Sequence, residues 1–181
     1  IKAFGNYLMA LGLTESGTEF PNKVRWGDAA ENFSYPSTWT AASTNDAGEV
    51  TIGDESDFIV DGLALKQSFV IYKENSTWIA NYIGGNLVFS FQKLFNDTGV
   101  LTRNCIAEFD GNHFVVTQGD LIVHDGVRKQ SVATDLVKKE LFDDINDAYY
   151  NLTFVAHNVQ QTEMWVCYPS IGPQYCNKTL I

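Results

Sequence analysis

The sequence is poor in the residues that build disulfide-stabilised or metal-dependent proteins. Among 181 residues there are only 3 cysteines, 3 histidines and 4 prolines. The cysteines, Cys105, Cys167 and Cys176, are odd in number and widely spaced, which argues against a disulfide framework and favours free buried thiols. A Cys167–Cys176 pair across a hairpin is the alternative. No C-x-x-C, H-x-x-x-H or H-E-x-x-H motif occurs, so we predict neither a metal site nor a cofactor.

Positive charge is also scarce. The chain has 12 lysines and arginines against 22 aspartates and glutamates, which gives a formal net charge of −10. A protein that reads nucleic acid needs the opposite balance to neutralise phosphates, so we expect no specific nucleic-acid binding. No apolar run approaches the roughly 18 residues that indicate a transmembrane helix, and we expect no membrane insertion.

Short runs rich in β-branched and aromatic residues dominate the chain. Polar turns separate them, and Asp110-Gly111 and Asp125-Gly126 are strong tight-turn pairs. The runs predict strands at residues 4–13, 22–26, 58–65, 68–73, 77–83, 87–94, 104–109, 113–117, 121–124, 153–157 and 164–168. This pattern is typical of an antiparallel all-β protein.

One segment, residues 131–150, has helical periodicity instead. Its apolar residues are Val132, Leu136, Val137, Leu141, Ile145 and Ala148. We expect one inserted amphipathic helix, capped by Ser131 or Thr134 and followed by Asn151 in a left-handed conformation. Its second half carries three acids, which the helix dipole disfavours there: Asp143, Asp144 and Asp147. A solvated face explains them simply, and a partner contact is the alternative.

An internal repeat groups the predicted strands. Residues 69–71 (Phe-Val-Ile) align with residues 114–116 (Phe-Val-Val), 45 positions later, and with residues 164–166 (Met-Trp-Val), 50 positions further on. Residues 6–13, NYLMALGL, read as the core of an earlier unit. A period of about 40 to 50 residues with about four strands per unit is typical of β-propeller blades. We therefore predict a single β-propeller-like domain over residues 1–181, with three to four blades of four antiparallel strands.

Three or four blades are too few for a closed propeller, and Ile1 stands where an initiator Met is usual. We therefore expect this chain to be part of a longer protein. An open stack of sheets or a β-sandwich remains the alternative architecture.

Catalytic residue types occur without a catalytic arrangement. Acids lie close together on single loops, whereas a glycosidase needs two carboxylates from separate elements across a cleft; these acids are Asp28, Glu31, Asp54, Glu55 and Asp57. The histidines read as partly buried strand residues: His113, His124 and His157. No G-x-S-x-G nucleophile motif is present, and Gly84-Gly85-Asn86 reads as a hairpin turn. We name no catalytic residue and expect no enzymatic activity.

The stretch 24–39, VRWGDAAENFSYPSTW, has neither helical nor strand periodicity. We interpret it as a long connection between blades, held down by Phe33, Tyr35, Pro36 and Trp39. Arg25 could pair with Asp28 or with an acid of the next blade. We expect the four tryptophans to fill seams between sheets rather than to stack on sugars: Trp26, Trp39, Trp78 and Trp165.

Five N-x-S/T triplets occur, and we interpret them as turn residues rather than glycan sites. Their asparagines are Asn32, Asn75, Asn96, Asn151 and Asn177. They would gain meaning in a secreted or cell-surface propeller, which is a weaker option.

Several stretches resemble, in order, tail proteins of short-tailed bacteriophages. They are VRWGD with a downstream P-x-x-W, IVDGLALKQSFVIYKENSTWIANYIGG, VFSFQKLF, GVLTRNCIAEFDGNHFVVTQGDLIVHDG, the helix ending in KKELF, and EMWVCYPS. They are similar to the nozzle family, also called tail hub or tail tubular protein B. The resemblance covers nearly the whole chain, and its specificity comes from the succession of the stretches.

The resemblance implies the propeller portion of a structural virion protein located in the tail. Such a protein assembles as a ring, a hexamer, below the portal and adaptor, and the genome leaves through it. The implied partners are further copies of the chain, portal and adaptor proteins, tail fibre proteins, and DNA that passes without specific binding. A net charge of −10 suits a wall along which DNA slides without sticking.

We predict five residues as interface contacts: Arg25, Asp28, Asp143, Asp144 and Asp147. The alternative function is a β-propeller that binds or cleaves glycans at the host cell surface through exposed tryptophans and acids. The sequence favours the structural function, because no paired carboxylates recur at matching positions of separate repeats.

Overall fold

The computed structural model describes residues 1–31, 34–53 and 56–181. Asn32, Phe33, Asp54 and Glu55, to which the sequence analysis gave roles, lie outside the described residues. The chain divides into two compact units, Ile1–Asp97 and Thr98–Ile181, which we describe one at a time. The single domain over residues 1–181 stays a prediction.

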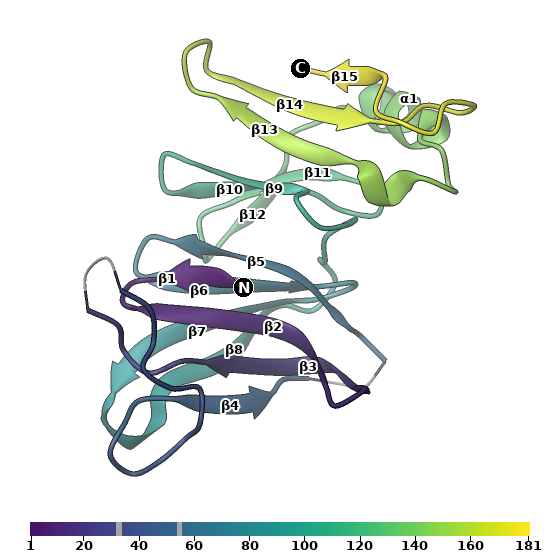
Figure 1. Cartoon of the computed structure of the whole chain (residues 1–181). Coiled ribbons are helices and arrows are strands. Elements are labelled where there is room, and N and C mark those ends of the chain that lie inside the picture. The colour runs from purple at the N-terminus through teal and green to yellow at the C-terminus, as the bar shows by residue number, and fades with distance from the viewer. Residues whose placement is uncertain (32–33, 54–55) are drawn as a thin grey trace. The chain divides into compact units, whose positions relative to one another are not determined.

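The first unit consists of two antiparallel sheets with four strands each, and the strands follow in chain order (Figure 1). Sheet 1 contains β1 (Lys2–Phe4), β2 (Tyr7–Glu15), β3 (Thr18–Trp26) and β4 (Gly48–Thr51). Sheet 2 contains β5 (Ile59–Leu65), β6 (Ser68–Lys73), β7 (Thr77–Gly84) and β8 (Val88–Phe95), with the 3-10 helix η1 (Gly85–Leu87) between its last two strands.

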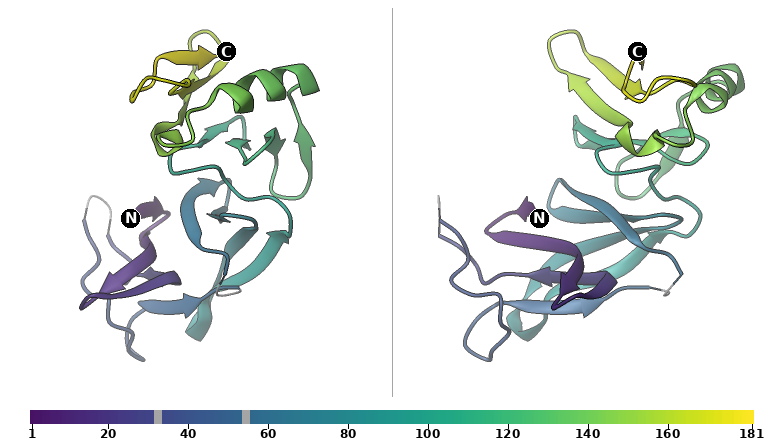
Figure 2. Two further views of the ribbon diagram at one scale, coloured as in Figure 1. Left: turned by 90° about the vertical axis from the view of Figure 1, so that its right-hand side faces the viewer. Right: turned by 45° about the vertical axis from the view of Figure 1, so that its right-hand side comes forward.

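The second unit contains two further antiparallel sheets and a helix. Sheet 3 contains β9 (Ile106–Phe109), β10 (Asn112–Val116), β11 (Leu121–His124) and β12 (Lys129–Ser131). Sheet 4 has three strands, β13 (Phe154–Asn158), β14 (Glu163–Tyr168) and β15 (Lys178–Leu180). Between the sheets in sequence come α1 (Asp135–Asp144) and the 3-10 helix η2 (Tyr150–Leu152). Both views of Figure 2 show α1 at one side of these two sheets.

These sheets confirm the predicted fold class, an all-β protein of repeated antiparallel blades like those of a β-propeller, with one inserted helix. The predicted repeat is confirmed too, because residues 69–71, 114–116 and 164–166 lie on β6, β10 and β14. Each of these is the second strand of its sheet, as is β2, which contains NYLMALGL except for its first residue. Second strands have neighbours on both edges, and in β6 and β10 every residue but the first is buried.

The core of the first unit is the seam between sheets 1 and 2. Its buried residues include Met9, Val24, Phe69 and Ile71, none of which is measurably exposed. Trp26 of sheet 1 meets Phe89 of sheet 2 edge to face, with ring centroids 5.3 Å apart. The prediction that tryptophans fill seams is thus confirmed for Trp26, and Trp78 packs against the same cluster.

The seam has glycines where large rings need room. Trp26 is paired with Gly48 on the neighbouring strand, and a Cβ on Gly48 would lie 2.4 Å from the Trp26 Cζ2 atom. Similarly, a Cβ on Gly62 would lie 2.8 Å from the ring of Phe69. Both contacts are far shorter than van der Waals separation, so the rings occupy the space that a side chain would need.

The helix is shorter than predicted. It spans Asp135–Asp144 instead of residues 131–150, and Thr134 is its N-cap, with Oγ1 accepting a hydrogen bond from the Val137 amide. Ile145 takes an extended conformation and forms an antiparallel bridge with Ser170. Because Ile145 pairs with Ser170 as a strand residue does, the helix ends at Asp144, although the apolar spacing that predicted a longer helix continues. Asn151 accordingly lies in η2 and caps no helix.

The interpretation of residues 24–39 as a connection between blades was wrong. Residues 27–47 join β3 to β4, which pair with each other within sheet 1. Of the described residues expected to hold this connection down, Pro36 is buried against Gly27 and Trp39 is half-buried, whereas Tyr35 is 81% exposed. In the described part of the chain, the longest helix is α1 with 10 residues, which is fewer than the roughly 18 that a membrane-spanning helix needs.

We expect Gly48→Ala to destabilise the first unit by about 1 to 3 kcal/mol, because the added methyl group must displace the ring of Trp26. Gly119→Ala is the matched control, since a Cβ there meets nothing within 4 Å and neither glycine has a positive φ. Calorimetric melting of both variants tests this. An equal shift in Tm for the two would show that the Trp26–Gly48 contact does not limit the packing of the seam.

Candidate functional site

Arg25 of β3 lies in an ion-pair ladder on the face of sheet 1 that points away from the seam. Its guanidinium lies 2.7 Å from Glu15 on β2 and also contacts Glu49 on β4. Lys23 adds contacts of 3.3 Å to Glu49 and 3.7 Å to Glu15. Arg25 holds the pKa of Glu49 below its usual value. The predicted partners, Asp28 or an acid of the next blade, were therefore wrong, because all of these partners belong to sheet 1.

Asp28 organises the connection between β3 and β4. Its Oδ1 accepts hydrogen bonds from the amides of Asp46, at 2.9 Å, and Ala29, at 3.0 Å. Its Oδ2 accepts one from the Ser37 hydroxyl at 2.9 Å, and its own amide donates to the Thr38 carbonyl. These donors lower the pKa of the Asp28 carboxyl, the Asp46 amide most. The residue thus has a structural role, and a partner contact stays a prediction.

The three acids predicted near the helix have different environments. Asp143 pairs with Lys139 one turn earlier, at 2.8 Å, on the exposed side of α1. Asp144 pairs with Lys178 of β15, also at 2.8 Å, and so ties the end of the helix to sheet 4. Asp147 lies beyond the helix in an exposed turn. Arg25 and Asp28 belong to the first unit and the three acids to the second, and the interface role of all five stays a prediction.

The histidines are strand residues, as predicted. His113 and His124 face each other on β10 and β11, with ring centroids 5.4 Å apart, and both are fully buried. Burial lowers the pKa of His124 to about 4, His113 adds to this effect, and Asp125 opposes it. The His124 Nδ1 atom accepts a hydrogen bond from the Gly126 amide. His157 is half-buried on β13 beside the ring of Phe109.

The other reactive groups are separate. All three cysteines are free thiols, of which only Cys105 is fully buried, so the Cys167–Cys176 disulfide is not formed. Within residues 1–31, 34–53 and 56–181 no group of three or more metal-ligating side chains comes together. Of the sequon asparagines, Asn75, Asn96, Asn151 and Asn177 are exposed and lie outside the strands.

A pocket of about 460 Å³ lies in the second unit, between sheets 3 and 4 and the start of α1. Nine of its lining residues are apolar: Phe114, Leu121, Val132, Ala133, Val137, Met164, Val166, Leu180 and Ile181. The remaining three are Thr134, Thr162 and Glu163. This volume and this mostly apolar lining are those of ligand and peptide sites. The pocket is therefore the candidate functional site of the unit.

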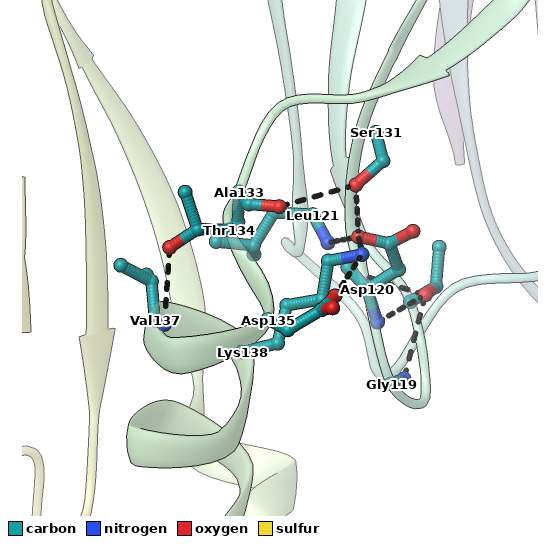
Figure 3. A network of polar contacts seen from close by, with 10 residues as sticks. Gly119, Asp120, Leu121, Ser131, Ala133, Thr134, Asp135, Val137 and Lys138 are labelled. Atoms are coloured by element: carbon teal, nitrogen blue, oxygen red, sulfur yellow. Dashed lines mark hydrogen bonds and ion pairs between the residues drawn. The ribbon is translucent and has the colours of Figure 1, made fainter.

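Polar contacts hold one wall of this pocket in place (Figure 3). The Asp120 Oδ1 atom accepts hydrogen bonds from the Leu121 amide and the Ser131 hydroxyl, both at 2.8 Å, and forms an ion pair with Lys138 at 3.0 Å. Leu121 itself lines the pocket, and the other two donors, Ser131 and Lys138, are next in sequence to the lining residues Val132 and Val137. Asp120 thus joins β11, β12 and the first turn of α1, and the pocket keeps its shape through this clasp.

The polar groups at and beside the pocket are engaged in contacts within the unit. The Ser131 hydroxyl donates to the Asp120 carboxylate, which also forms the ion pair with Lys138. These contacts hold β12 and α1 in place. Glu163 is the charged residue of the pocket lining, and its Oε2 accepts a hydrogen bond from the Trp165 indole at 2.9 Å. Sequence reasoning missed the site, because its apolar residues look like ordinary core residues and come from separate segments.

A scan against protein-family models and a search of curated proteins found no match to the chain. The function of the protein must therefore be inferred from the geometry of the described residues and from the sequence resemblance.

We expect Asp120→Ala to lower the free energy of unfolding by about 1 to 2 kcal/mol, because three donors lose their shared acceptor. Asp135→Ala is the matched control: that carboxylate is fully exposed and 3.9 Å from the same Lys138, so its loss should change stability by less than about 0.5 kcal/mol. Urea unfolding followed by circular dichroism measures both. Equal losses would contradict the role of Asp120 as a clasp.

Stability should also fall as the pH drops from 6.5 to about 4, beyond what carboxylates cause. In this window His124 is protonated in the unfolded chain but neutral in the fold, so the unfolded state binds more protons. The contribution is about 3 kcal/mol, since one pKa unit corresponds to about 1.4 kcal/mol.

Thermal melts across this pH range should show that His124→Gln removes this part of the slope. The matched variant His157→Gln should keep it. A His124→Gln slope identical to that of the unsubstituted chain would contradict the assignment.

Proposed function

We propose that this chain is a structural protein of a short-tailed bacteriophage, the propeller portion of a nozzle subunit in the tail. The stretches that resemble nozzle proteins carry the proposal. IVDGLALKQSFVIYKENSTWIANYIGG spans β5 to β7, VFSFQKLF is β8, GVLTRNCIAEFDGNHFVVTQGDLIVHDG spans β9 to β11, and EMWVCYPS contains the whole of β14. The resemblance thus follows the blade strands in order rather than scattered surface positions.

Charge and packing support a mechanical role. The surplus of acids, with a net charge of −10, suits a conduit wall from which a DNA duplex is repelled. Seams filled by rings and glycines give stiff sheets, since close-packed interiors deform little. In this proposal several copies, six by the resemblance, form a ring through heterologous contacts below the portal and adaptor.

Electron microscopy of particles from the source, with an antibody raised against this chain, tests the proposal. We expect the antibody to label a six-fold ring beneath one capsid vertex, and no label on the other vertices. Recovery of the chain only as a free monomer in cell extract, with unlabelled particles, would overturn it.

A glycan-binding propeller is the second candidate, and one observation favours it. The connection 27–47 presents Tyr35 with 81% of its surface exposed, and Trp39 of the same connection is partly exposed. Exposed aromatic rings can stack on sugar rings. A glycan array with the purified chain decides between the candidates: specific binding that Trp39→Ala abolishes while the fold stays intact would favour this second function.

A further inference from the structure

We propose that a second, polar pocket, at the β11–β12 hairpin, binds a small hydroxylated carboxylate of the sugar-acid class. In this proposal Arg128 pairs with the carboxylate of the ligand, and the amide side chains of Asn112 and Gln130 bind its hydroxyl groups. The inference concerns residues other than those of the apolar pocket, and it does not depend on the tail assembly.

The polar pocket has a volume of about 320 Å³ and lies within the second unit. Of the seven described residues that line it, Val123 is apolar and the other six are polar or charged: Asn112, His124, Asp125, Arg128, Lys129 and Gln130. Sheet 3 already has four strands, so this pocket does not take the place of a missing strand. Its size is at the lower end for small-molecule sites, and its lining suits a polar ligand.

Arg128 provides a positive charge that no acid neutralises. Six other basic residues form ion pairs with acids: Lys2, Lys23, Arg25, Lys138, Lys139 and Lys178. By contrast, no acid in the described part of the chain pairs with the guanidinium of Arg128, and the side chain is exposed. A guanidinium presents parallel N–H donors that match the two oxygens of a carboxylate.

The turn that carries Arg128 is held by its own hydrogen bonds. The Asp125 Oδ1 atom accepts from the Val127 amide at 2.8 Å and from the Arg128 amide at 2.7 Å. The Asp125 amide donates to the Arg128 carbonyl at 3.2 Å, and the Gly126 amide donates to His124 Nδ1. The backbone of Arg128 is therefore positioned before a ligand arrives, which lowers the entropic cost of binding.

The charges around the pocket favour a ligand with one negative charge. Lys129 adds a second cation, which also contacts the Thr98 hydroxyl, and Asp125 is the acid among the described lining residues. Two cations and one acid disfavour a metal cation, and Asp125 disfavours a phosphate dianion. DNA is repelled by the net charge of −10, whereas a small monoanion responds mainly to these nearest charges, because salt screens those beyond about 8 Å.

Two amide side chains suit the hydroxyl groups of the ligand. The Asn112 Nδ2 group donates to the Asp110 carbonyl at 3.1 Å, and among the described residues no donor contacts its Oδ1 atom. The Gln130 side chain is exposed and makes no hydrogen bond with any described residue. An amide group both donates and accepts, as a hydroxyl does, so each can bind a hydroxyl group next to the carboxylate.

Three probes test the ligand chemistry. Glucuronate has a carboxylate and hydroxyl groups, glucose has the hydroxyl groups alone, and glucose 6-phosphate has a phosphate in place of the carboxylate. We expect NMR titration of the isotope-labelled chain to give a Kd of about 0.1 to 1 mM for glucuronate. Glucose should bind at least about tenfold more weakly, and glucose 6-phosphate at least about threefold more weakly.

Two arginine variants locate the binding. Arg128→Gln should weaken glucuronate binding by at least about tenfold, and Arg128→Lys should restore only part of it, because lysine keeps the charge but lacks the planar pair of donors. Arg103→Gln is the matched control. Arg103 is an exposed arginine of the same unit, also without an acid partner among the described residues and outside the lining, so its loss should leave the affinity within about twofold.

The backbone amide signals of Arg128 and Gln130 should shift with glucuronate, and far-UV circular dichroism checks that the variants are folded. Equal affinity for glucose and glucuronate, or equal losses in Arg128→Gln and Arg103→Gln, would overturn the proposal. Tighter binding of glucose 6-phosphate would overturn the assignment to a carboxylate. Signal shifts confined to residues outside the pocket, or no saturation by about 10 mM glucuronate, would show only adventitious binding and overturn it as well.

Discussion

The structure depends on one constraint: the second strand of each sheet has neighbours on both edges and apolar side chains that need cover. β6 shows it most clearly, since Phe69, Val70, Ile71 and Tyr72 are all fully buried. A strand of this kind cannot lie on a surface, so a second layer must pack against its sheet. In the first unit sheet 1 covers the face of β6 that carries Phe69 and Ile71. Within each sheet one ring lies against a glycine of the neighbouring strand: Trp26 against Gly48, and Phe69 against Gly62. The remaining strands pair alongside these central strands. The ion pairs of Arg25 with Glu15 and Glu49 lie on the face of sheet 1 that points away from the seam.

The sequence predicted strands correctly where burial requires a run of apolar residues. The residue ranges of β6 and β11 were predicted without error, and the repeat identified the second strand of every sheet. It failed where pairing alone makes a strand: β1, β4, β12 and β15 have three or four residues each and no apolar run of their own. The predicted helix was too long, because the apolar spacing continues through Ile145. The bridge from Ile145 to Ser170, which ends the helix, cannot be recognised from the local sequence. Arg25 was assigned wrong partners for the same reason, since the register that brings Glu15 and Glu49 beside it is a property of the folded sheet.

The candidate site could not be predicted from the sequence either, because its lining residues are far apart along the chain. Its lining comes mainly from β10, β11, the β12–α1 link, α1, β14 and β15, and each of its apolar residues alone looks like an ordinary core residue. The three-stranded sheet 4 could not be recognised from the sequence either, because β15 itself was missed. The polar groups beside the pocket are engaged in holding its wall, as Asp120 holds Ser131 and Lys138.

Asp28 has a wider consequence. A single carboxylate gathers Ala29, Ser37 and Asp46, so both ends of the connection between β3 and β4 are fixed at their base. The pairing register of β3 and β4 therefore does not depend on the exposed side chains of this connection. The exposed Tyr35 can change in size, charge or polarity at little cost to folding. Substitutions at Tyr35 can therefore alter the surface that sheet 1 presents while the pairing of β3 with β4 stays the same.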